Sequence, residues 1–154
     1  MSDLKYLTVQ DMLWINLKVC RKVNRYDFAR LEEATFYQYG YGKSLDLVGQ
    51  AGRFVKGFVA KAPFTDGNEA TAFVGLVGFL RINGRRLRLD DKEALDWFRR
   101  SVVGGEGPSI DLADVVIEDS THHGPIPADA VNRILREVLA EYPETVSGLL
   151  SVGV

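Results

Sequence analysis

The sequence contains one cysteine, two histidines and no long hydrophobic run. Cys20 alone excludes a disulfide framework within the chain and fits a reducing compartment. The longest apolar stretch, from Thr71 to Leu80, falls well below the ~18 residues that indicate a membrane span. Asp3, Lys5 and Asp11 interrupt the first twenty residues, which therefore lack the apolar core of a signal peptide. These absences predict a cytoplasmic protein that does not contact a membrane.

Neither sign of charge is in large excess, because 19 Lys and Arg residues stand against 21 Asp and Glu residues, a net charge of -2. A protein that mainly coats nucleic acid needs a strongly basic face, so the composition argues against that class while leaving room for a local basic patch. A chain of 154 residues has the length of one domain. Such a chain buries roughly 70% of its unfolded surface, so it needs no metal or disulfide to fold.

Apolar residues recur mostly at the three- and four-residue spacing that is typical of helices. Thr8 and Asp90 are the expected N-caps of two of these helices. The spacing and caps predict helices over residues 8–22, 29–37, 45–62, 68–83, 91–103 and 127–142, with Pro143 ending the last one. Residues 68–83 are apolar nearly all round, which indicates a buried central helix. The predicted fold class is all-α, a helical bundle with at most a small β-hairpin flap.

Two of these helices are separated by a short polar loop, Ala62-Pro63-Phe64-Thr65-Asp66-Gly67-Asn68-Glu69-Ala70. The backbone amides and the dipole at a helix N-terminus favour an anion, and Gly67 would allow a phosphate to approach the backbone. Asn68 is a candidate donor to that phosphate, and Asp66 is a candidate ligand for a divalent cation. A plain turn that caps the second helix explains the same residues, so the loop alone leaves both interpretations open.

The loop and its flanks resemble the signature of the Fic/Doc (Fido) family, H-x-F-x-(D/E)-G-N-(G/K)-R-T. Ahead of the loop, the segments 31–34 and 45–60 resemble the family's L-E-x-A helix and the helix that leads into the motif. Residues 79–84, Phe-Leu-Arg-Ile-Asn-Gly, resemble the F-L-x-x-N-G that ends the family's central helix. The resemblance is to a short Doc-like member and covers residues 4–103. It implies a helical core over residues 1–103 and a C-terminal extension over residues 104–154 that packs on the same domain.

The resemblance also shows what this motif lacks. The position of the family's catalytic His is Ala62, and the position of its phosphate-binding Arg is Ala70. Glu69 places a negative charge where the family has Gly or Lys. Without a general base, a transfer reaction typically loses 10²–10⁴-fold in rate. We therefore expect a catalytically degenerate Fic/Doc protein that needs no cofactor and binds a protein partner, in a toxin–antitoxin setting with an antitoxin-like chain as the candidate.

Two other functions stay open at this point. A residual enzyme would use ATP and Mg²⁺ to adenylylate or phosphorylate a protein hydroxyl, with His122 or His123 as the substitute base. A nucleic-acid binder would use the arginines between Arg81 and Arg100, although acidic residues interleave with them.

The last group of candidates is the flap, where the alternating Tyr37, Tyr39 and Tyr41 would line one face of an extended segment that binds a partner strand. An exposed His pair, a solvated charged surface and a plain surface turn are the simpler readings of these three groups.

Overall fold

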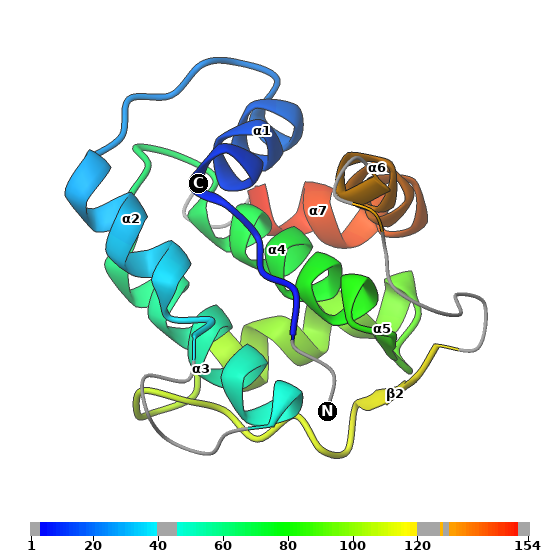
Figure 1. The fold of residues 1–154 in the computed structure, drawn as a ribbon. Coiled ribbons are helices and arrows are strands. Elements are labelled where there is room, and N and C mark those ends of the chain that lie inside the picture. Colours follow the sequence, from blue (N-terminus) through cyan, green and yellow to red (C-terminus); the bar gives the residue numbers. More distant parts are fainter. Residues whose placement is uncertain (1–3, 40–45, 120–126, 128–129, 151–154) are drawn as a thin grey trace.

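The fold is an array of helices around one central helix, as seen in a computed structural model that describes residues 4–39, 46–119, 127 and 130–150. The central helix is α4, Asn68–Ile82, and every one of its residues from Ala70 to Ile82 is buried. Figure 1 shows α4 in the middle of the molecule. The prediction of a buried central helix is confirmed.

The remaining helices pack around α4. The elements in chain order are α1 (Val9–Cys20), α2 (Phe28–Phe36), α3 (Leu47–Lys61), α4, α5 (Asp91–Trp97), a π-helical segment η1 (Phe98–Val103), α6 (Ala130–Glu141) and α7 (Pro143–Leu150). Contacts with α4 come from α1, α3, α6 and α7 (Figure 1). The C-terminal helices therefore share the core with the rest of the chain, through buried residues such as Leu135, Val138 and Leu149.

Two short strands complete the fold, β1 (Arg85–Leu87) and β2 (Val116–Glu118). They pair antiparallel, with Arg86 opposite Ile117. The all-α class with a small antiparallel strand pair is thus confirmed. Residues 40–45 of the predicted flap, including Tyr41, lie outside the described residues.

Several helix ends follow from local sequence chemistry. Thr8 and Asp11 form a capping box at the start of α1, in which each side chain accepts the other residue's backbone N–H. Asp90 and Glu93 do the same for α5. Gly84, with φ 80°, follows α4 in the left-handed conformation expected there. The predicted end of α1 near residue 22 was too late, since Arg21 already has left-handed angles and ends the helix after Cys20.

The sequence did not predict α7. Pro143 was expected only to end a helix, yet it also opens the next one, because proline suits the first helical position. The carboxylate of Asp91 accepts the backbone N–H groups of Glu144 and Thr145 at 2.9 and 2.8 Å, and so caps α7 from another helix. That partner lies more than fifty residues away in sequence, where a local pattern cannot reveal it.

Candidate functional site: the loop between α3 and α4

The loop that carries the motif runs from Ala62 to Gly67, between the end of α3 and the start of α4. Ala62 ends α3 in the left-handed region with φ 44°, which costs an alanine roughly 1 kcal/mol. Gly67 adopts φ 77° at the N-cap of α4, where glycine carries no such cost. Ala62 and Gly67 thus both have left-handed backbone angles, the first where the chain leaves α3 and the second where it enters α4.

Asn68 closes this loop with both ends of its side-chain amide. Its Oδ1 accepts the backbone N–H of Phe64 at 2.9 Å, and its Nδ2 donates to the carbonyl of Phe64 at 2.8 Å. The Phe64 side chain is buried, and its backbone forms an antiparallel bridge with Tyr26 in the α1–α2 connection. The amide of Asn68, a candidate phosphate donor from sequence, thus bonds to the loop itself.

A second set of polar side chains holds the other half of the loop. Asn16 on α1 donates through Nδ2 to the carbonyl of Asp66 at 3.0 Å and to Oγ1 of Thr71 at 3.1 Å. Asn24 donates to Oδ1 of Asn16 at 2.9 Å. Asn16 is only 2% exposed, so this network is part of the core.

Sequence analysis missed Asn16 and Asn24. One signal was available for Asn16: it follows Met12 by four residues, on the face of α1 that also buries Ile15 and Val19. A lone amide on a buried face requires hydrogen-bond partners. Nothing in the sequence names those partners, since Asp66 and Thr71 lie fifty or more residues away.

The carboxylate of Asp66 points to a lysine rather than to other acidic groups. Lys22 Nζ lies 2.8 Å from Asp66 Oδ2, and both side chains are more than half exposed. This ion pair raises the pKa of Lys22. Among the described residues, no group of three or more His, Cys, Asp or Glu side chains gathers to hold a metal ion. Asp66, the predicted metal ligand, therefore belongs to no such group in that part of the chain.

A cavity of about 450 Å³ opens beside the loop, and its lining does not suit a phosphate. The charged side chains that line it are Lys22, Asp66 and Glu69, one cation against two carboxylates. Burial raises the pKa of Glu69, and the nearby Arg99 opposes that rise. Oε1 of Glu69 is buried without a hydrogen-bond partner. An anion in this cavity would meet an excess of negative charge.

The two positions that the resemblance aligns with the catalytic His and the phosphate-binding Arg of the Fic/Doc family hold small side chains, Ala62 and Ala70. Ala62 is exposed at the rim of the cavity and presents only a methyl group. Ala70 is fully buried, so a longer side chain there would displace its neighbours. The residues present thus do not fit the phosphates of a nucleotide.

Helices α1 and α7 form the remaining walls of this cavity, through Cys20, Leu149 and Leu150. A side chain at Gly67 would place its Cβ 2.3 Å from Cys20 Sγ and 3.5 Å from Leu150 Cδ2, so both helices pack closely against the loop. Burial raises the pKa of the Cys20 thiol. Cys20 therefore packs against the loop as a neutral thiol.

The described flap tyrosines, Tyr37 and Tyr39, are half-buried and contact neighbouring parts of the chain. Tyr37 has helical angles at the end of α2, which contradicts the extended conformation predicted for it. Its ring fills the space above Gly57, whose Cβ would lie 2.3 Å from the ring. The ring of Tyr39 lies 4.1 Å from that of Tyr6, centroid to centroid. These two rings pack against neighbouring helices and turns, because the chain is still turning at the end of α2.

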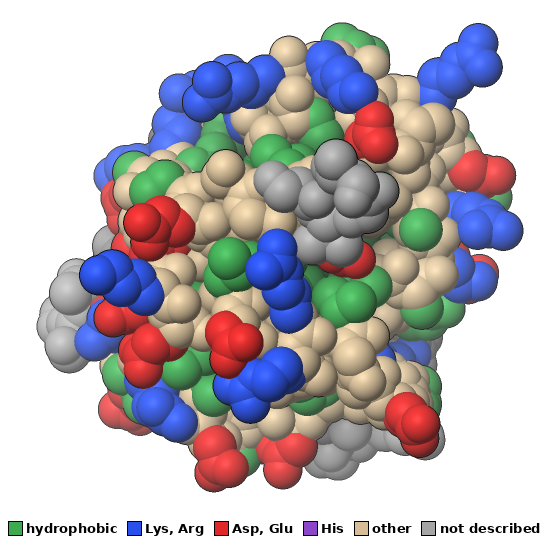
Figure 2. All heavy atoms as spheres, turned by 180° about the vertical axis from the view of Figure 1, so that it is seen from behind, with side chains coloured by type: hydrophobic (Ala, Val, Ile, Leu, Met, Phe, Trp, Pro, Cys, Tyr) green, Lys and Arg blue, Asp and Glu red, His purple; other side chains and the backbone are tan. Residues whose placement is uncertain are grey.

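The arginine region does not form one basic face. Arg81 was counted among surface cations, but its side chain is 7% exposed and forms an ion pair with Glu141 on α6. Arg100 pairs with Asp96 at 2.8 Å, and Arg99 donates to the carbonyl of Gly148 at 2.9 Å. Figure 2 shows acidic and basic side chains interspersed over most of the rear face. His122 and His123 lie outside the described residues.

No family model, curated protein or solved structure matches this chain. In the part of the chain that the structure describes, no helix is both long enough and apolar enough to cross a membrane.

Proposed function

We propose that this protein is a catalytically degenerate, Doc-like member of the Fic/Doc family that acts by binding another protein. One observation carries the proposal: the polar groups that remain in the motif are engaged in holding the loop. Asn68 bonds twice to Phe64, and Asp66 is held by Asn16 through its carbonyl and by Lys22 through its carboxylate. These residues stabilise a turn at the motif, while the positions of the family's His and Arg hold Ala62 and Ala70.

The electrostatics of the cavity support the same conclusion. Glu69 lies in the first turn of α4, where its charge interacts favourably with the helix dipole. In a nucleotide-binding site, the positive end of the helix dipole would attract a phosphate. Here the carboxylate of Glu69 already lies at that end of α4, so the cavity disfavours a further anion.

The surface that best fits a protein partner is the α1–α2 connection, residues 21–27, together with Phe28 at the start of α2. Val23, Tyr26 and Phe28 are 87%, 45% and 58% exposed. Arg21 and Arg25 are exposed beside them. Figure 2 shows Lys and Arg side chains along the upper edge of the molecule, where this connection runs in Figure 1. Apolar groups with a basic rim favour a partner that presents apolar and acidic side chains together.

Label transfer tests the loss of chemistry. The purified chain is incubated with a cell lysate, Mg²⁺ and ATP labelled at the α- or the γ-phosphate, and labelled proteins are detected after electrophoresis. The proposal predicts no labelled protein beyond a no-enzyme control. A labelled band that disappears in the Asp66→Ala, Asn68→Ala variant contradicts it.

A binding assay tests the surface. Proteins captured by the wild-type chain are compared with those captured by Phe28→Asp, and Ile117→Asp serves as the control because Ile117 is exposed on β2, outside this connection. We expect Phe28→Asp to lose a partner that Ile117→Asp retains. Equal capture by both variants would assign the binding to another surface.

A further inference from the structure

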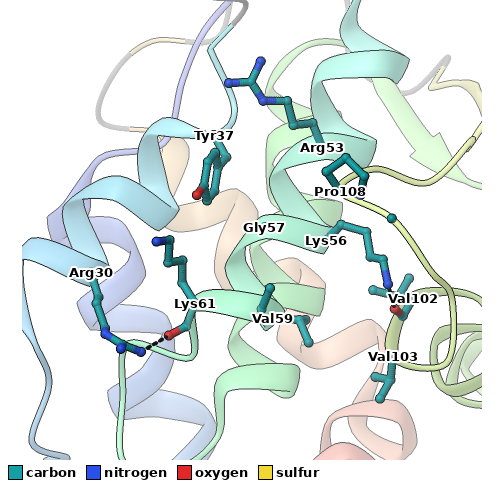
Figure 3. Close-up of a pocket in the computed structure, with 12 residues that line it drawn as sticks. Arg30, Tyr37, Arg53, Lys56, Gly57, Val59, Lys61, Val102, Val103 and Pro108 are labelled. Atoms are coloured by element: carbon teal, nitrogen blue, oxygen red, sulfur yellow. Dashed lines mark hydrogen bonds between the residues drawn. The ribbon is translucent and has the colours of Figure 1, made fainter.

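A second cavity, of about 580 Å³, lies on the other side of the end of α3. It is lined by α2, α3, the end of η1 and the loop that follows, and Figure 3 shows its side chains. It shares only Val59 with the lining of the motif cavity. Its volume is within the range of about 300–1,000 Å³ that is typical of small-molecule sites.

Four cationic side chains line this cavity, namely Arg30, Arg53, Lys56 and Lys61. The three on α3 come from one broad side of the helix, because Arg53 precedes Lys56 by three positions and Lys61 by eight, and residues at these spacings lie within about a quarter turn of each other. No Asp or Glu is among the described residues of the lining. Glu33 stands at the margin, where it pairs with Lys61 and accepts the hydroxyl proton of Tyr37 at 3.0 Å.

Backbone carbonyls, rather than carboxylates, hold two of these cations in place. Lys56 donates to the carbonyls of Val102, at 2.9 Å, and Gly105. Arg30 donates through Nη1 to the carbonyl of Lys61 at 3.1 Å (Figure 3). Such bonds orient the side chains but supply no negative charge, and Glu33 is a carboxylate that interacts with both Arg30 and Lys61. Among the described lining residues together with Glu33, cationic side chains outnumber carboxylates four to one.

The rest of the lining is apolar and includes one aromatic ring. Val59, Val102, Val103 and Pro108 form part of the wall. The ring of Tyr37 lies on Gly57, and the guanidinium of Arg53 lies 5.9 Å from the centre of that ring. This combination suits a ligand with an anionic end and a flat apolar body.

We propose that this cavity binds a small phosphate ester with an apolar or aromatic body. A phosphate presents several charged oxygens to cations that arrive from two helices, and arginine forks match phosphate geometry. A carboxylate would compensate fewer of these charges. The apolar wall and Tyr37 would hold the body of the ester. This site goes beyond the proposed function, which concerns the other cavity and the α1–α2 connection.

Phenyl phosphate is the test ligand, because it contains the phosphate and one aromatic ring and nothing else. Inorganic phosphate lacks the ring, and benzoate lacks the phosphate. Binding is measured by calorimetry and by following the backbone amides of the ¹⁵N-labelled chain. We expect saturable binding of phenyl phosphate, weaker binding of the other two, and shifts at the amides of residues 53–61 including Gly57. An absence of saturable binding, or shifts confined to other regions, would overturn the proposal.

Two variants and a control refine the test. Arg30→Gln and Arg53→Gln each remove a cation from the lining, and Arg86→Gln removes an exposed arginine outside it. We expect each of the first two to weaken binding about tenfold, the typical effect of losing one charge-assisted hydrogen bond. Arg86→Gln should bind like the wild type. Unchanged affinity in both lining variants would overturn the proposal. Shifts at residues 66–69 on adding ATP and Mg²⁺ would instead count against the proposed function, so the two failures are distinguishable.

Discussion

Asn68→Ala should destabilise the loop between α3 and α4. The substitution removes both hydrogen bonds between the side-chain amide and the backbone of Phe64, at 2.9 and 2.8 Å. At about 1 kcal/mol for each bond, the loss is about 2 kcal/mol. Alanine returns about 0.5 kcal/mol through its higher helix propensity. We therefore expect the free energy of unfolding to fall by about 1.5 kcal/mol.

Urea denaturation followed by circular dichroism measures this change. With a slope of about 2 kcal/mol per molar urea, the midpoint should fall by about 0.7 M. Asn132→Ala is the control, because that asparagine makes one exposed hydrogen bond, to Arg136 on the same helix. Its effect should stay within about 0.5 kcal/mol. A loss below about 0.5 kcal/mol in Asn68→Ala would refute the claim that Asn68 holds the loop together.

Three further predictions concern buried polar groups. Asn16→Ala removes three hydrogen bonds in the core and should lower the free energy of unfolding, measured by urea denaturation, by about 3 kcal/mol. A loss below about 1 kcal/mol would contradict the role of this network. Burial raises the pKa of Glu69 in the folded chain, so stability should fall as pH rises above the ordinary value of 4.5. The free energy of unfolding of Glu69→Gln should therefore exceed that of the wild type by about 0.5 kcal/mol at pH 7 and equal it at pH 4. An equal gain at both pH values would contradict burial as the cause. Glu141→Gln leaves the buried charge of Arg81 without its carboxylate and should lower the free energy of unfolding by about 2 kcal/mol. The control Asp96→Asn breaks an exposed pair and should lower it by less than about 0.5 kcal/mol. Similar losses for the two variants would refute the role of burial.

Local chemistry was enough to predict much of the fold. The capping residues Thr8 and Asp90, the apolar surface of α4 and the left-handed Gly84 each follow from a few neighbouring residues. The turn at the motif also follows from its own residues, since Gly67 alone can enter α4 with a positive φ at no cost. Such features need no knowledge of distant parts of the chain.

The parts that the sequence could not predict depend on distant partners. In the sequence Arg81 belongs to a basic cluster, and it forms a buried ion pair only because Glu141, sixty residues later, lies beside it in the fold. Tyr37 was expected on an extended face, but Gly57 provides the space that takes its ring. The cation-lined cavity combines residues from α2, α3 and the loop after η1, so no single segment of the sequence predicts it.

The central claim is that the loop between α3 and α4 is a structural turn that does not hold a nucleotide. A titration of the ¹⁵N-labelled chain with ATP and Mg²⁺, read at the backbone amides of Gly67, Asn68 and Glu69, tests it most directly. The account predicts that these amides do not move at several millimolar ATP. A saturable shift at these three amides, lost in Asn68→Ala, would contradict it.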